Sequence, residues 1–428
     1  MAGPAGVIEI ASMLIGAQVI RRRWWVIGLA GLIWMALGAF FFVDALIDEW
    51  RIPAVYFAVP LLIDGGISLL AAFDSAGTAR RIRFVKAAAF LLIALLVLSG
   101  HAYSAMIVGF VAGAYLVVDA LWRAGSAYVV RFRRWRLSLF NAGIEFLLGA
   151  WSFLPWPTQW QGEVGMDVGL LLMVSAFGLC SLAWRIVRLP PGVPMSRIMS
   201  REGLRGFAAP AAAQDAVPGG AGAVTVHVWT PTGGLAPIGR GVSRYVAAVD
   251  EQGVISTGHA ALEGPGIYVS HYPAAEIDRS PEDFRQTLRA TADNDVAGRF
   301  LPGYAEEAAG WQPSTFQVRL DGLDLGALRA FWEGYRADDT YNLTNRNCSG
   351  TVVAVMEAGL EGIFARHAAS PWFLLRLLLS PELWIAGHLR ARAAAMAWTP
   401  GLVLDYARAL SHVLALPDRL APTRPRTG

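Results

Sequence analysis

Long apolar runs separated by short polar loops occupy the first 190 residues of the chain. Six of them, near residues 24–43, 53–73, 84–100, 103–122, 135–156 and 166–187, approach the length of a membrane span. A helix needs roughly 20 apolar residues to cross a hydrocarbon core of about 30 Å. The pattern therefore predicts an α-helical six-span transmembrane bundle over residues 1–190. The apolar stretch before it, Ala5 to Ile20, is expected to be an interfacial or half-inserted helix, not a removable signal peptide.

The amino-acid composition supports a membrane protein and orients it. Hydrophobic residues make up 55% and charged residues 16% of the chain, whereas soluble proteins carry about 25% charged residues; a purely soluble enzyme is excluded. Three basic residues lie in Arg21–Arg23, four in Arg80–Lys86 and five in Arg123–Arg136, whereas the opposite loops contain only Arg51. Because positive loops stay on the cytoplasmic side, we expect a multi-pass protein of a bacterial inner membrane with both termini cytoplasmic.

The six runs are internally repeated. Arg23-Trp24 aligns with Arg134-Trp135 at an offset of 111 residues, and Asp64 recurs as Asp119 at an offset of 55. Both offsets fit three helical hairpins. With its arginine-tryptophan starts and glycine-rich helices, the region resembles the HdeD-like family of six-helix inner-membrane proteins associated with acid resistance. Acids within apolar spans are costly, so Asp64, Asp119 and Glu145 either form a proton or ion pathway or pair with Arg or Trp groups to lock the hairpins together.

An α+β unit is predicted after the bundle. Residues 191–223, rich in Ala, Pro and Gly, hold too few bulky apolar side chains for a core and are expected to be a flexible linker. Residues 224–365 combine strand-like alternation, as in Thr225–Trp229, with helical periodicity, as in Cys348–Leu360. Residues 366–428 are expected to be an apolar helical segment and a tail, and its apolar section 371–396 is expected at the membrane interface.

The strongest candidate chemistry is a thiol that opens a predicted helix, in Asn347-Cys348. The positive end of a helix favours the thiolate, and His259 is the expected base. If the turn after its strand has three residues, Gly264–Gly266, His259 opposes His271, which would orient it. A turn of two or four residues shifts the register and brings Ser270 to face His259 instead. Backbone N–H groups at the helix start, assisted by Asn347, are expected to bind the oxyanion.

These residues resemble the circularly permuted papain-like superfamily, which includes NlpC-type, lecithin retinol acyltransferase-like and lipoprotein N-acyltransferase-like enzymes. Gly258-His259 matches the opening histidine, His271 the second polar residue, and Asn347-Cys348 the nucleophile. The resemblance implies a permuted papain-like catalytic domain over 224–365, acting as a cysteine hydrolase or acyltransferase through an S-acyl enzyme at Cys348. Tethering beside lipid favours acyl groups of lipids or lipoproteins as substrates. A membrane-bound cysteine peptidase or amidase, and a non-catalytic membrane stress or interaction protein, are the alternatives.

The remaining expectations concern ligands and partners. No cofactor is expected, and one cysteine and two histidines without a fourth ligand at short spacing argue against a metal site. The expected partners are membrane lipids and a lipid, lipoprotein or peptide substrate; no nucleic acid is expected, and a homo-oligomer through the bundle is allowed. Cys180, in the sixth run, is expected to be an inert packing residue, and His227 an exposed strand residue.

Overall fold

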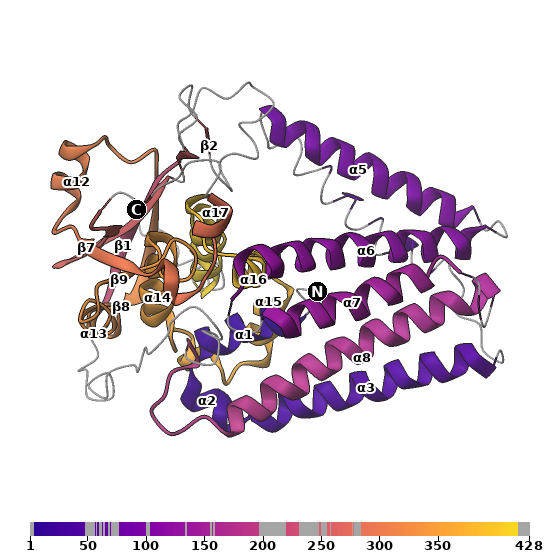
Figure 1. The fold of residues 1–428 in the computed structure, drawn as a ribbon. Coiled ribbons are helices and arrows are strands. Elements are labelled where there is room, and N and C mark those ends of the chain that lie inside the picture. Colours follow the sequence, from indigo (N-terminus) through magenta and orange to yellow (C-terminus); the bar gives the residue numbers. More distant parts are fainter. Residues whose placement is uncertain are drawn as a thin grey trace, which may run out of the picture. The chain divides into compact units, whose positions relative to one another are not determined.

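The structure, a computed structural model, describes residues 4–47, 77–99, 103–132, 135–154, 159–196, 220–230, 258–275 and 284–417, with shorter pieces between 56 and 69 and at 156, 248–249, 255–256 and 277. The chain divides into two compact units (Figure 1). The helical unit comprises Ile27–Tyr128 and Trp135–Ser181. The α+β unit comprises Ala2–Val26, Val129–Arg134 and Leu182–Gly428, so it also includes the N-terminal segment that was predicted to belong to the bundle.

Long apolar helices build the helical unit, as predicted. They are α3 (Trp24–Ile47), α5 (Gly77–Leu98), α6 (Ser104–Val130), α7 (Trp135–Trp151) and α8 (Gln159–Val187). Trp24–Ile47, Ser104–Val130 and Gly165–Val187 are long and apolar enough to cross a membrane. Large apolar side chains such as Leu32 and Phe177 are exposed on these helices. Helices that are apolar on every side are typical of a membrane environment.

The six predicted runs are not all found as spanning helices. In α5 the apolar part is limited to Ala87–Leu98, and α7 has 17 residues, fewer than the roughly 20 that a span needs. Most of the predicted run 53–73, including Asp64, lies outside the described residues. The described part of the chain therefore supports three candidate spans.

Small residues allow close helix contacts within this unit. A Cβ atom added to Gly31 on α3 would lie 2.7 Å from Cys180 Sγ on α8, and one added to Gly38 would lie 2.8 Å from the carbonyl oxygen of Gly169. A Cβ atom at Gly149 on α7 would lie 2.9 Å from Cβ of Leu116 on α6. Glycines are used in this way where membrane helices approach closely.

Two of the predicted intramembrane acids meet one arginine. Arg123 Nε lies 2.9 Å from Asp119 Oδ2 on the same helix and 3.4 Å from Glu145 Oε2 on α7. The interpretation that these acids lock helices together through an arginine predicts this arrangement. The sequence did not indicate a second buried pair in this unit, in which Ser152 Oγ donates to Asp167 Oδ1 at 2.7 Å.

Two antiparallel sheets organise the α+β unit. The first has the order β5-β4-β1-β8, formed by β5 (Ile267–Val269), β4 (His259–Gly264), β1 (Ala221–Trp229) and β8 (Phe316–Asp324). The second has the order β6-β7-β9, formed by β6 (His271–Pro273), β7 (Val296–Phe300) and β9 (Thr340–Tyr341), and a further pair joins β2 (Ala248–Val249) to β3 (Ile255–Ser256). The predicted α+β class is confirmed.

Helix α14 (Cys348–Leu360) is the central helix of this unit. Most of its side chains are buried, and it packs on β4, β8 and α13 (Leu325–Tyr335). Asp324 caps α13 by accepting hydrogen bonds from Gly326 N and Ala327 N at 2.8 and 3.0 Å. Shorter elements complete the unit: α2 (Ala17–Arg22), α11 (Phe284–Thr287), α12 (Tyr304–Gly310) and the 3-10 turns Ala292–Asn294 and Ala365–His367.

The C-terminal helices belong to the same unit, so its structure does not end at the predicted boundary of residue 365. They are α15 (Pro371–Leu379), α16 (Pro381–Ala395) and α17 (Pro400–Leu414), and α17 packs on β1 and β8. Helix α1 (Pro4–Ile15) packs on α16 with Ile10, Met13 and Leu14 fully buried. The first apolar stretch, predicted at the membrane interface, is thus covered by protein.

Candidate active site

The candidate nucleophile opens α14, as the sequence predicted. Asn347 is the N-cap residue: its Oδ1 accepts from Gly350 N at 2.7 Å, and its Nδ2 donates to the carbonyls of Leu343 and Trp398 at 2.8 and 2.9 Å. Both amide hydrogens are therefore engaged by carbonyl oxygens, and the side chain does not support the predicted contact with an oxyanion. Asn347 instead fixes the helix start and the position of Cys348.

The hairpin that carries His259 has a two-residue turn. Its register pairs Leu262 with Val269 and Gly264 with Ile267, leaving only Pro265 and Gly266 between the strands. The expected three-residue turn is wrong, and the alternative register applies. Side chains alternate across a strand, so Ser270 faces His259 and His271 points to the opposite side.

His259 lies between the thiol and an acid. Its Nε2 lies 3.0 Å from Ser270 Oγ and 3.1 Å from Glu307 Oε1, and the ring is close enough to Cys348 for each group to shift the pKa of the other. Because these contacts engage Nε2, Nδ1 is the ring nitrogen that remains for the thiol. The ring stacks on Tyr272 with centroids 4.0 Å apart. The structure therefore brings together the cysteine and the histidine that the sequence paired.

Glu307, on α12, is the site residue that the sequence reasoning missed. Its carboxylate accepts hydrogen bonds from Tyr268 Oη at 2.5 Å and Tyr272 Oη at 2.7 Å, in addition to its contact with His259. The neighbouring Glu306 is exposed. The only sequence signal was a pair of adjacent acids on a short helix, and nothing in their spacing relates them to His259, 48 positions earlier.

The charges of these three groups support one another. Burial opposes ionisation of Cys348, but the His259 charge and the N–H of Ala260 outweigh it and lower the pKa of the thiol. Burial alone would lower the pKa of His259; Cys348 and then Glu307 reverse this and raise it to about 9. Burial likewise opposes ionisation of Glu307, yet hydrogen bonds from His259 and the tyrosines bring its pKa to about 2. Each of these shifts moves its group toward the charged form, which is the thiolate, the imidazolium or the carboxylate.

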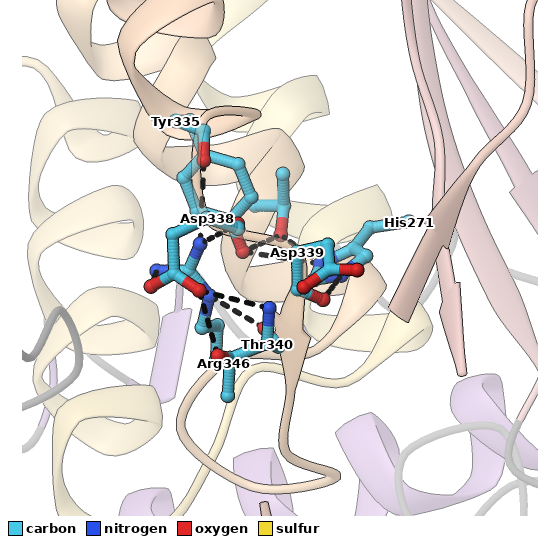
Figure 2. A network of polar contacts seen from close by, with 7 residues as sticks. His271, Tyr335, Asp338, Asp339, Thr340 and Arg346 are labelled. Atoms are coloured by element: carbon cyan, nitrogen blue, oxygen red, sulfur yellow. Dashed lines mark hydrogen bonds and ion pairs between the residues drawn. The ribbon is translucent and has the colours of Figure 1, made fainter. Parts of the chain in front are cut away.

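His271 lies in a separate buried network, shown in Figure 2. Its Nδ1 is 3.1 Å from Tyr335 Oη, and its Nε2 donates to the carbonyl oxygen of Asp339 at 3.3 Å. Burial, aided by the charge of Arg346, lowers the pKa of His271 to about 4, so the ring is neutral at pH 7. The structure does not bring His271 to His259, and the predicted orienting contact between the two histidines is not the one formed.

Arg346 donates hydrogen bonds to several carbonyl groups of the segment that leads to Cys348 (Figure 2). Its Nε donates to the carbonyl oxygen of Thr340 at 2.6 Å, its Nη2 donates to those of Tyr335 and Asp338, and its guanidinium lies over the Tyr335 ring. These contacts bind the segment between α13 and α14 to a buried cation, two residues before Cys348.

A further prediction concerns the exposure of His227. His227 is buried, not exposed: its Nδ1 is 3.0 Å from Ser314 Oγ, its Nε2 is 3.2 Å from Glu263 Oε2, and its ring stacks on Tyr304. Strand β1 lies inside the sheet and is covered on both faces, which alternation alone could not show.

Among the described residues, no group of three or more His, Cys, Asp or Glu side chains is placed to hold a metal ion.

Comparison with known proteins gives one similarity. A family model described as the IcsB middle domain matches residues 270–421, little more than a third of the chain. The match contains Glu307 and Cys348 and continues through α15, α16 and α17, which agrees with placing these helices in the α+β unit. No curated protein and no solved structure matches the chain.

Proposed function

We propose that this protein is a membrane-anchored cysteine hydrolase or acyltransferase that works through an S-acyl enzyme at Cys348. The observation that carries the proposal is the cluster of Cys348, His259 and Glu307, which are 6%, 3% and 3% exposed. His259 Nε2 lies 3.1 Å from Glu307 Oε1, and Cys348 and His259 shift the pKa of one another. A thiol beside a base that a third group orients is the signature of an activated nucleophile.

The proposed reaction gives each group a role. The Cys348 thiolate attacks the carbonyl carbon of an ester or amide, and the oxyanion meets the backbone N–H groups of Cys348 and Ser349, since a helix leaves its first N–H groups without partners inside the helix. His259 gives its Nδ1 proton to the leaving oxygen or nitrogen. Water or an acceptor then attacks the thioester and gives its proton back to His259, and the thiolate leaves. Glu307 stabilises the imidazolium throughout.

The basic ends of the candidate spans support a cytoplasmic position for the site. Within the α+β unit, Arg23 Nη1 donates to the carbonyl oxygen of Ala368 at 3.0 Å, just before α3. Arg185 Nη2 bonds Glu9 Oε1 at 2.8 Å near the end of α8. Ala290 N donates to the carbonyl oxygen of Val130 at 2.6 Å, at the end of α6. These arginine-bearing helix ends thus belong to the unit that carries Cys348, which accords with positive residues remaining on the cytoplasmic side of a bacterial inner membrane.

Acyl groups of membrane lipids or lipoproteins are the substrates that this arrangement favours, because the site is tethered to membrane-spanning helices. A second candidate function is ligand binding by the α+β unit without catalysis. The low exposure of Cys348 is the observation that favours it. A peptidase or amidase would use the same groups on a peptide carbonyl.

Labelling of the full-length protein in membranes tests the proposal. An alkyne-tagged acyl β-lactone should acylate Cys348, the label should be lost in Cys348→Ala and strongly reduced in His259→Ala, and Cys180→Ala should label like the wild type. Competition by a lipid extract, and not by a peptide library, would support the lipid substrate. A folded protein whose Cys348 stays unlabelled while it binds lipid would contradict catalysis and favour the binding function.

A further inference from the structure

An exposed apolar surface runs along α15 and α16. We call the α15–α16 face the surface formed by Trp372, Leu375, Leu379, Trp384 and Ile385. Leu379 is 69% and Trp372 is 60% exposed, and the other three side chains are close to half exposed. Residues 372, 375 and 379 recur at the spacing of one helical face, so they form a continuous stripe.

The opposite side of α15 is already occupied by protein. Phe373 and Leu377 are buried, and α15 contacts both α1 and α16. Packing within the unit therefore explains the inner stripe of this apolar helix and leaves the outer stripe unexplained. Soluble proteins rarely expose contiguous apolar patches of this kind without an interaction partner.

The α15–α16 face is linked to the point where the chain enters a candidate membrane span. Arg23 immediately precedes α3, and its guanidinium bonds the carbonyl oxygen of Ala368, three residues before α15 begins. Helix α1, which packs on α15 and α16, is joined through Glu9 to Arg185 near the end of α8. Arg23 and Arg185, beside the ends of two candidate spans, therefore belong to the same unit as this surface.

The chemistry of the surface suits the polar layer of a bilayer. Arg376 lies over the ring of Trp372 at 4.9 Å from its centroid, and Arg366 is exposed nearby. The acidic Glu382 is bound by Ser380 Oγ at 2.7 Å. Tryptophans beside arginines, with leucines between them, are typical of segments that lie among lipid headgroups, where the indole ring has both an apolar and a polar environment.

We propose that the α15–α16 face lies in the headgroup layer of the bilayer that the spanning helices of the same chain cross. Trp372, Leu375 and Leu379 would reach the acyl boundary, and Arg366 and Arg376 would meet phosphate groups. The α+β unit would then be held flat on the membrane at a second place besides its covalent connections. This inference concerns a binding surface and stands without the proposed catalytic activity.

Spin-label accessibility tests the contact in the full-length protein. Leu379→Cys and, separately, Leu375→Cys are labelled in a Cys180→Ala/Cys348→Ala background and reconstituted in nanodiscs of phosphatidylethanolamine and phosphatidylglycerol. Trp311→Cys is the matched control, since Trp311 is 48% exposed in the same unit but far from α15 in sequence. Accessibility to oxygen, which concentrates in lipid, is compared with accessibility to a water-soluble nickel chelate.

The ratio of oxygen to nickel accessibility should be several-fold higher at 379 and 375 than at 311. An equal ratio at all three positions would place the α15–α16 face in water and overturn the proposal. Protection of 379 and 375 from both reagents would show a protein contact, such as a second copy of the chain, and would also overturn it. Two labelling positions keep the result interpretable if one variant fails to fold.

Discussion

Replacement of Glu307 by Gln removes the negative charge behind His259 and preserves the shape of the side chain. Glu307 Oε1 lies 3.1 Å from His259 Nε2, and a hydrogen bond to a charged group contributes about 1.5 to 3 kcal/mol. Because 1.36 kcal/mol corresponds to a tenfold change in rate, loss of this one bond predicts a fall in kcat/KM of about 10- to 150-fold. The hydrogen bonds from Tyr268 and Tyr272 act on the Glu307 carboxylate and not on His259, so they do not contribute to the predicted fall in kcat/KM.

The pH dependence of Cys348 reactivity gives the sharper readout. In the wild type, the Cys348 thiolate and the His259 imidazolium coexist at pH values above the lowered pKa of the thiol and below the raised pKa of His259, about 9. Without the carboxylate the imidazolium is less stable, so the pKa of His259 should fall. The thiolate then loses its counter-charge, and the pKa of Cys348 should rise. The acid limb of the profile therefore moves up and the basic limb moves down, which narrows the active range.

The assay is the rate of iodoacetamide alkylation of Cys348 against pH, in a Cys180→Ala background, with turnover of an acyl ester measured in parallel. Ser270→Ala is the matched control, because Ser270 Oγ lies 3.0 Å from the same Nε2 but is uncharged. It should change the rate less than tenfold, as expected for a neutral hydrogen bond of about 1 kcal/mol, and leave the limbs in place. An unshifted profile in Glu307→Gln, with a shifted one in Ser270→Ala, would refute the role given to the carboxylate.

The other substitutions test single contacts. Cys348→Ala should abolish turnover with an unchanged melting temperature, because it removes a nucleophile and little packing, and retained turnover would rule out the thiol mechanism; Cys180→Ala should have no effect on turnover. His271→Ala should lower the free energy of unfolding by about 2 to 4 kcal/mol, because it leaves a cavity and removes the hydrogen bonds of the ring to Tyr335 and Asp339. The alkylation profile of Cys348 in the folded fraction should keep its limbs; shifted limbs would restore His271 to the site. Asn347→Ala should lose about 0.5 to 2 kcal/mol of stability in denaturant titration, as loss of an N-cap does. Arg390 Nε on α16 bonds Glu357 Oε1 on α14 at 2.7 Å, with side chains that are 12% and 4% exposed. Glu357→Gln should destabilise the unit by about 3 to 5 kcal/mol, because it removes the carboxylate charge from a largely buried ion pair; an unchanged melting temperature would argue against this bond.

The proximity of the candidate nucleophile and base could be predicted because their signals are local. A cysteine after Asn at the start of an apolar helix and a histidine at the start of a strand are visible in a few residues each. The partner of His259 depended on the length of one turn, and Pro265-Gly266 shifts every side chain of the following strand to the other face. Glu307 could not be found in this way, because only tertiary packing brings α12 to β4.

The helical parts show a similar limit. Apolar length and glycine spacing correctly indicated long helices that pack closely through residues such as Gly31 and Gly38. Length and hydropathy do not distinguish a helix covered by lipid from one covered by protein. The sequence therefore predicts an interfacial helix at α1, although this helix packs within the α+β unit.

Mass spectrometry of Cys348 after exposure to native lipids tests the central claim most directly. Full-length protein in its own membrane is mixed with excess lipid extract, quenched in acid at times from milliseconds to minutes, and digested to release the peptide that contains Cys348. The account predicts an acyl thioester on that cysteine, whose mass identifies the donor, and no such adduct in His259→Ala. A Cys348 peptide that carries no acyl group at any time, from protein whose thiol still reacts with iodoacetamide, would contradict the S-acyl enzyme.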